Sequence, residues 1–181
     1  MNTSRLVAFG LVCVLAGALL DQAIAQARKV SFTPEMIAGK STAEKAAAFL
    51  DGAAEMSDNG SWELIAIGRA WYLGGNKDKG QALFDRVTSS EDVESSDWYR
   101  IGHVYAEAGE RDKARAAFDK FGSLEGRSEK HLIEYGAALI AIGDEAAGER
   151  RFARAMERRP RDFWGWTAAG GAYLGVLPML Q

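Results

Sequence analysis

Small and large apolar residues recur through the middle of this chain at a constant spacing of 34 positions. Three columns of residues show the spacing: Gly68, Gly102, Gly136 and Gly170 in the first, Gly75, Gly109 and Gly143 in the second, and Phe84, Phe118 and Phe152 in the third. A fourth column, between the second and the third, holds only small residues: Gly80, Ala114 and Gly148. Independent columns that share one period indicate a structural repeat.

Each repeat unit carries the pattern of two helices. Large apolar residues stand three or four positions apart around the first glycine, which is the spacing of one face of an α-helix. They are Leu64, Ile67 and Trp71 in the first unit, Trp98, Ile101 and Tyr105 in the second, and Leu132, Tyr135 and Leu139 in the third. The second glycine is expected to end this helix with a positive φ. A second helix then carries the small residue and the phenylalanine.

A helical hairpin is therefore the predicted unit of the fold. Small residues at Gly68 and Gly80 allow two antiparallel helices to approach closely, while Phe84 fills the space beside them. Such a hairpin cannot bury its apolar face alone, so it has to stack on its neighbours. The pattern predicts an all-α protein, an α-solenoid of stacked antiparallel hairpins.

The units resemble the tetratricopeptide repeat, whose pattern is W-x2-L-G-x2-Y, then alanine, an aromatic residue four positions later, and proline. The matching residues are Trp98, Ile101, Gly102, Tyr105, Ala114 and Phe118 in the second unit, and Gly136, Phe152, Ala155 and Pro160 in the third. The resemblance covers residues 61–94, 95–128 and 129–162 and a partial unit, 163–181, with Trp166, Gly170 and Tyr173 in register. It implies a repeat domain over residues 41–181, with about three full units and a half-unit at each end.

The residues before the first full unit are expected to form an entry segment and a cap. Residues 26–40 have the composition of a linker, in which Thr33–Glu35 starts a single helical turn that Gly39 closes. Ser41–Glu44 has the sequence of a capping box. A helix over residues 42–56 is therefore predicted as the N-terminal cap of the array.

The first 25 residues have the pattern of a secretory signal peptide. Arg5 precedes the uncharged apolar run Leu6–Leu20, and Ala23–Ala25 offers an A-x-A cleavage site. The run is shorter than the ~20 residues that span a bilayer as a helix, so an uncleaved anchor is the alternative rather than the prediction. Cys13 lies inside the run without the small-residue box of bacterial lipoproteins, so lipidation is not expected. A periplasmic or secreted location is predicted.

The chain after the signal peptide offers little catalytic chemistry. It holds no cysteine, and its two histidines, His103 and His131, form no zinc-binding pattern. No nucleophile elbow or phosphate-binding loop occurs either. We therefore expect no enzyme activity, no cofactor and no metal site. The formal net charge of −3 argues against general affinity for nucleic acid.

Two charged stretches have a structural and a functional interpretation. Ser89–Asp97 is an acidic connector, interpreted as solvated, with a cation or partner site as the alternative. Ser61, and then Ser95 or Ser96, are expected to cap the first helices of units one and two. Three arginines of unit three share one helix face: Arg150, Arg154 and Arg158. That face is interpreted as solvated, with a dock for an acidic surface or anionic headgroups as the alternative.

Residues 163–181 contain no charged side chain. A stacked array normally has a polar outer face on its last helix, whereas this segment has an apolar one. Two interpretations stay open: Val176–Gln181 folds back over that face, or a partner covers it. In the second case, residues 163–181 would attach the chain to an envelope complex or to another copy of itself.

The resemblance implies that the first helices of the units line a concave groove for a protein or peptide. The helix face about a third of a turn from the core face carries the residues assigned to this groove. They are Trp62, Ile65, Arg69 and Tyr72 in unit one, Tyr99, His103 and Ala106 in unit two, and Ile133, Ala137, Ile140, Trp164, Trp166 and Thr167 in the last two units. Trp62 and Tyr72 have packing against the N-terminal segment or a neighbouring helix as the alternative.

The composition of this face favours an apolar or aromatic partner. One branch of the family clamps a C-terminal carboxylate with lysine and asparagine at groove positions. Of the residues at those positions here, only Arg69 could serve in that way: they are Ile65, Arg69, Tyr99, His103, Ile133 and Ala137. Aromatic residues with one arginine are typical of interface hot spots. The predicted function is an exported scaffold or adaptor that mediates protein–protein interaction in a bacterial-type cell envelope. The alternative is a structural subunit of an envelope or membrane complex, docked through the apolar C-terminal helix.

Overall fold

A computed structural model describes residues 31–124 and 129–178, and the regular structure in these ranges is helical. The predicted signal peptide, residues 1–25, lies outside the described residues. None of the helices in the described ranges combines the length and the apolar character that crossing a membrane requires. The chain divides into two compact units, Met1–Asp58 and Asn59–Gln181.

The first unit contains a short 3-10 helix, η1 (Pro34–Met36), and the helix α2 (Thr42–Met56). Ser41 caps α2, since its hydroxyl accepts a hydrogen bond from the Glu44 N–H at 3.3 Å. The Glu44 carboxylate in turn accepts from the Ser41 N–H at 2.8 Å. The predicted helix and its capping box are both confirmed.

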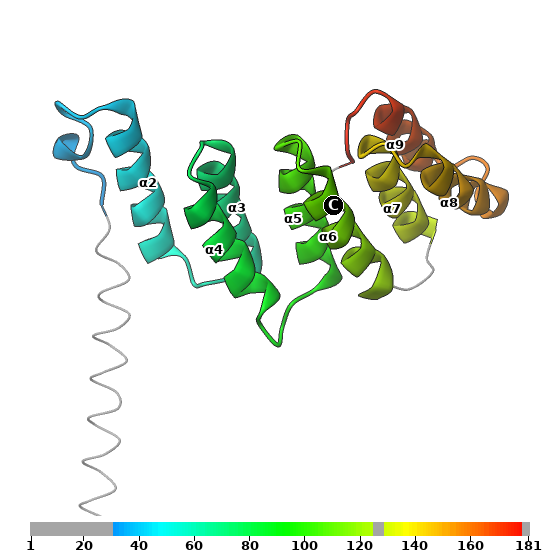
Figure 1. The fold of residues 1–181 in the computed structure, drawn as a ribbon, viewed down its shortest axis with the longest axis horizontal. Helices are drawn as coiled ribbons and strands as arrows, with labels where there is room; N and C mark the ends of the chain where they lie inside the picture. The colour runs from blue at the N-terminus through cyan, green and yellow to red at the C-terminus, as the bar shows by residue number, and fades with distance from the viewer. Residues whose placement is uncertain (1–30, 125–128, 179–181) are drawn as a thin grey trace, which may run out of the picture. The chain divides into compact units, whose positions relative to one another are not determined.

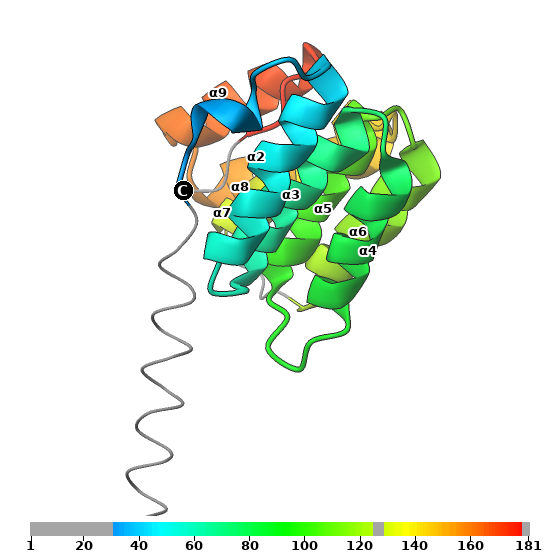
Figure 2. The same cartoon turned by 90° about the vertical axis from the view of Figure 1, so that its left-hand side faces the viewer.

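The second unit is an array of helical hairpins (Figure 1). Its helices are α3 (Ser61–Leu73), α4 (Lys77–Thr88), α5 (Ser95–Glu107), α6 (Arg111–Leu124), α7 (Glu129–Ala141), α8 (Glu145–Arg158) and α9 (Phe163–Tyr173). Each hairpin pairs two successive helices, and neighbouring hairpins pack through α3 and α5 and through α6 and α7. Figure 2 shows α4 and α6 in a layer beside α3 and α5. The predicted all-α solenoid is confirmed.

The glycine columns bring the two helices of each hairpin together. A Cβ atom at Gly68 would lie 2.6 Å from Cε1 of Phe84, and one at Gly80 would lie 2.7 Å from the Gly68 carbonyl oxygen. A Cβ atom at Gly102 would meet the Phe118 ring at 2.5 Å. Both phenylalanines are fully buried. The helix contact predicted from the columns is therefore present and recurs from one unit to the next.

The second glycine column ends the first helix of each hairpin. Its three members, Gly75, Gly109 and Gly143, have φ values of 99°, 75° and 92°. The residue after each glycine donates its N–H to the carbonyl five positions earlier, as in a Schellman motif: Asn76 to Trp71, Glu110 to Tyr105, and Asp144 to Leu139. The predicted helix ends are confirmed.

The starts of the first helices differ from the prediction. Gly60 precedes α3 as its N-cap, so the cap predicted at Ser61 is wrong. Glu94 precedes α5, so the cap predicted at Ser95 or Ser96 is wrong as well. In each case the serine lies inside the first helical turn, one or two positions after the N-cap residue.

Asp97 holds the start of α5 in place of a serine cap. Its side chain is 0% exposed, and its carboxylate accepts a hydrogen bond from the Glu94 N–H at 3.1 Å. Arg100 approaches the same carboxylate at 3.4 Å. The last residue of the acidic connector Ser89–Asp97 therefore has a structural role, because it satisfies a donor at the helix start.

Ion pairs join successive hairpins near the starts of their second helices. Glu110 pairs with Lys77 of the preceding hairpin and with Lys113 of its own. The hydrogen bond from Lys77 is the largest cause that lowers the pKa of Glu110 to about 2. Arg115 and Asp144 form the equivalent pair between the second and third hairpins. Glu110 and Asp144, which follow the glycines that end α5 and α7, thus link their hairpins to the preceding ones.

After α9 the chain reverses direction and runs back along the array. Gly175 has a φ of 76°, and Val176 donates its N–H to the Gly171 carbonyl at 2.9 Å. Two residues later, the Tyr99 O–H of α5 donates to the Pro178 carbonyl at 3.0 Å. Figure 1 shows this segment passing from α9 towards α5. Residues 176–178 of the predicted segment Val176–Gln181 therefore fold back, and residues 179–181 lie outside the described residues.

Candidate binding groove

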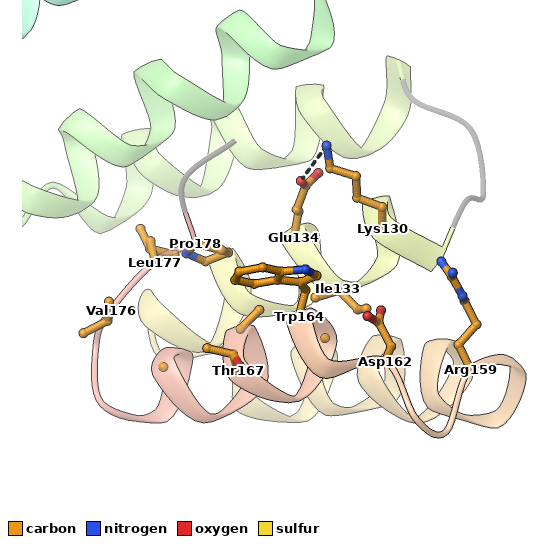
Figure 3. A pocket seen from close by; sticks show the side chains of 13 residues that line it. Lys130, Ile133, Glu134, Arg159, Asp162, Trp164, Thr167, Val176, Leu177 and Pro178 are labelled. Atoms are coloured by element: carbon orange, nitrogen blue, oxygen red, sulfur yellow. Dashed lines mark ion pairs between the residues drawn. The ribbon is translucent and has the colours of Figure 1, made fainter. Parts of the chain in front are cut away.

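A cavity of about 570 Å³ lies between α7, α9 and the returning C-terminal segment (Figure 3). Its volume is within the range of protein sites that take a ligand or the side chains of a peptide. Charged, aromatic and apolar side chains line it, among them Lys130, Ile133, Glu134, Arg159, Asp162, Trp164, Thr167, Leu177 and Pro178. The C-terminal segment fills a gap that continues from this cavity towards α5. We call the cavity and this gap together the groove.

The close packing of α9 on α7 forms the apolar wall of the groove. A Cβ atom at Gly165 would lie 2.7 Å from Cδ1 of Ile133, so the glycine allows the two helices to approach. Ile133 is 5% exposed. Trp164, the neighbour of this glycine, is 65% exposed, and its indole lies across the cavity (Figure 3). The groove therefore has a buried aliphatic wall and an accessible aromatic ring.

Charged side chains stand at the rim of the groove. Lys130 and Glu134 of α7 form an ion pair at 3.7 Å on one side (Figure 3). Arg159 and Asp162 line the cavity from the turn between α8 and α9. Asp162 is the N-cap residue of α9, but its side chain makes no capping hydrogen bond. An apolar centre with a charged rim is the usual arrangement of a protein interface.

The buried Tyr99 and the half-buried His103 form an aromatic layer on α5 beside the C-terminal segment. Tyr99 is 1% exposed, and its ring centroid lies 4.6 Å from that of His103. Burial, followed by the charge of Glu134, raises the pKa of Tyr99, so its hydroxyl is a neutral donor. Burial, followed by the charge of Arg69, lowers the pKa of His103 to about 4. The His103 Nε2 has no hydrogen-bond partner among the described residues.

The predicted groove residues of α3 divide between core and surface. Ile65 and Tyr72 are 4% and 1% exposed, and the Tyr72 O–H donates to a carboxylate of the next hairpin at 2.6 Å. Both side chains stabilise the packing of the array instead of forming an open surface. Trp62 is 64% exposed, while Arg69 pairs with Glu107 of α5 at 2.7 Å. None of these four residues lines the cavity.

The predicted residues of α7 and α9 divide in the same way. Ile133, Trp164 and Thr167 line the cavity. Trp166 is 64% exposed and lies outside the lining, where its Nε1 donates to a carbonyl of the α8–α9 turn at 3.0 Å. Two further predicted positions on α7 are buried in the core: Ala137 and Ile140.

Several cavity residues were not among those predicted for the groove: Lys130, Glu134, Arg159, Asp162, Leu177 and Pro178. One signal for them was present, because the spacing of Lys130 and Glu134 places both on the helix face that flanks Ile133. Leu177 and Pro178 had no comparable local signal, since their position depends on the reversal after α9.

The outer side of α9 and the turn after it form a second exposed surface. Large apolar side chains remain in contact with solvent there: Phe163 at 69% exposure, Trp166 at 64%, Tyr173 at 53% and Leu174 at 83%. The returning segment therefore covers only part of the apolar C-terminal helix. An exposed apolar surface of this kind is often a contact surface.

No family model matches the chain, and no curated protein matches it either. Within residues 31–124 and 129–178, no group of three or more histidine, cysteine, aspartate or glutamate side chains is placed to hold a metal ion. The function is therefore argued from the geometry of the groove.

Proposed function

We propose that this chain is a scaffold or adaptor that binds a segment of a partner protein in the groove. The observation that carries the proposal is the cavity between α7 and α9, where Trp164 is 65% exposed beside the buried Ile133. Tryptophan in a well-packed apolar setting is the residue type that contributes most to many protein interfaces. The charged rim adds specificity for the residues that flank the anchored side chain.

The chemistry of the groove suits binding rather than catalysis. Lys130 and Glu134 neutralise each other in an ion pair, and neither His103 nor His131 lines the cavity. A partner can pack an apolar side chain on Trp164 and place polar groups towards Arg159 and Asp162. The proposed partner is a protein or peptide, and the proposed role needs no cofactor or nucleic acid.

The type of repeat and the location of the protein are part of the proposal. The shared register of the glycine and phenylalanine columns supports a repeat of the tetratricopeptide type. The pattern of the first 25 residues supports export to the periplasm or beyond the cell. The partner would then be a protein of the cell envelope.

Capture of partners by Trp164→Ala tests the proposal, with two matched controls. Trp62 and Trp166 are each 64% exposed and lie outside the cavity lining. The tagged full chain and the three alanine variants are used to capture proteins from the native envelope. We expect Trp164→Ala to weaken capture of the partner by about tenfold or more, since a hot-spot tryptophan contributes at least ~1.4 kcal/mol. Equal capture by all three variants would contradict the proposal.

A second candidate function, docking as a structural subunit through α9, is favoured by the exposed outer side of that helix. Phe163 and Leu174 are 69% and 83% exposed, so the surface is accessible at both ends of the helix. In the same experiment, a loss of capture confined to Trp166→Ala would favour this second function over the first.

A further inference from the structure

We infer that the groove takes an extended partner segment in which an apolar residue precedes a proline, and that residues 176–178 of the chain occupy this place until the partner displaces them. The inference rests on the proposed function, because it names the chemistry of the partner at the same site. It also assigns the C-terminal segment a regulatory role.

The C-terminal segment lies at a gap between two hairpins. The helix α3 packs on α5, and α7 packs on α9, whereas α5 and α7 approach each other much less closely. Leu177 packs against the core cluster that includes side chains of α5, and with Pro178 it also lines the cavity on α7 and α9. The segment thus bridges the two hairpins and continues the cavity towards α5.

Tyr99 selects for a main-chain carbonyl at this gap. The residue is 1% exposed, and its hydroxyl donates to the Pro178 carbonyl at 3.0 Å. A buried donor that loses its acceptor is costly, so a segment that replaces residues 176–178 has to supply another acceptor in the same place. An extended peptide has such carbonyls free, whereas a helix uses its carbonyls internally. An extended segment is therefore the form of partner that fits.

The residue types of the C-terminal segment indicate which side chains fit. Pro178 has no N–H, so it brings an acceptor to this half-buried place without a donor that needs a partner. Leu177 fills a half-buried apolar position. Val176 is 61% exposed, so the position before the apolar residue is open to many residue types. The expected sequence of the partner segment is any residue, then an apolar residue, then proline.

The connection to α9 is suited to release of the segment. Leu174 is 83% exposed, and the glycine that follows it takes the left-handed conformation, with a φ of 76°. Release would break the hydrogen bond of Tyr99 and expose one half-buried leucine, which a partner segment restores when it binds. Because the segment occupies the site, the apparent affinity for a partner is the intrinsic affinity multiplied by the fraction of chains in which the site is open.

The test uses the full chain and a defined probe, a fluorescein-labelled, amidated peptide with the sequence of Tyr173–Pro178. Leu177→Asp in the full chain places a charge in the half-buried apolar position and releases the segment. We expect fluorescence anisotropy to show that this variant binds the peptide about tenfold more tightly than the wild type does. If Leu177→Asp loses the helical circular dichroism of the wild type, Leu177→Ala is measured in its place.

Two controls test whether the Tyr99 hydroxyl and the proline of the peptide contribute to binding. Tyr99→Phe, combined with Leu177→Asp, removes only the hydroxyl and should weaken binding of the peptide about threefold to tenfold. A peptide with alanine in place of Pro178 should also bind more weakly. The inference is overturned if the peptide binds the wild type and Leu177→Asp equally, or if it binds neither.

Failure of the inference can be told apart from failure of the proposed function. If Trp164→Ala abolishes capture of the partner while the peptide does not bind, the proposed function stands and the inference falls. A concentration-dependent dimer of the wild type that Leu177→Asp abolishes would also overturn the inference. In light scattering, that result would assign the groove to the C-terminal segment of a second copy.

Discussion

Single glycines of one sequence column have different consequences in this fold, because the helix that each one meets differs. At Gly68 and Gly102 a side chain would collide with the phenylalanine of the second helix. At Gly170 in α9 there is nothing within 4 Å of the Cβ position. Glycine is therefore required at a position of this column only where a second helix crosses the first.

Replacement of Gly102 by alanine tests this requirement. The new Cβ atom would lie 2.5 Å from the Phe118 ring, so we expect the free energy of unfolding to fall by about 1–3 kcal/mol. Gly170→Ala is the matched control and should leave stability unchanged or raise it by up to about 1 kcal/mol, because alanine favours the helix. Urea unfolding followed by circular dichroism measures both. Similar losses in the two variants would refute the assignment of Gly102 to a helix crossing.

His103 predicts a pH dependence of stability. Burial lowers its pKa from 6.5 to about 4, so the unfolded chain takes up a proton in this interval and the folded chain does not. The free energy of unfolding should therefore fall as the pH drops from 6.5 towards 4, by up to about 1.4 kcal/mol per pH unit. Below that range, protonation of Glu110 in the unfolded chain lowers the free energy of unfolding further, because the pKa of Glu110 in the folded chain is lowered from 4.5 to about 2.

The comparison with His103→Leu isolates the imidazole. The variant keeps an apolar side chain in the layer beside Tyr99 and has no group that titrates in this interval. Urea unfolding at pH 7, 6, 5 and 4.5 should give a wild-type curve that falls more steeply than that of the variant. Parallel curves would show that the histidine is protonated equally in the folded and unfolded chains.

At the scale of elements, the sequence was sufficient for most helices and for their ends. The apolar periodicity and the helix-ending glycines act locally, so a one-dimensional pattern predicts them. Helix starts were harder to predict, because the Glu94 N–H at the start of α5 donates to Asp97 inside the first turn. The serines at the expected cap positions therefore misled the prediction, whereas the residue that stabilises the helix start is Asp97, three positions after Glu94.

The candidate groove was only partly predictable, because two helices and a returning segment form it. Ile133 and Trp164 were predicted from their position on the helix face, and both line the cavity. Tyr72 and Tyr99 were predicted from the same face but are buried, at 1% exposure each. In a stacked array, each first helix contacts its own second helix and the next hairpin. More of its surface is therefore buried than the apolar face of that helix alone would indicate.

In the whole molecule, α9 differs from the other first helices of the described residues. The helices α3 to α8 form three hairpins that support one another, while α9 packs on α7 and is followed by the returning segment. That segment turns back and reaches Tyr99. The groove lies between α7, α9 and this segment, and the outer side of α9 stays exposed.

Hydrogen exchange of the full chain, measured with and without the captured partner, shows whether the partner binds in the groove. We expect slower exchange of the backbone amides of residues 130–134 in α7 and 164–168 in α9 when the partner is bound, with α4 unchanged. Slower exchange confined to α4 and α6, or unchanged exchange throughout α7 and α9, would contradict it.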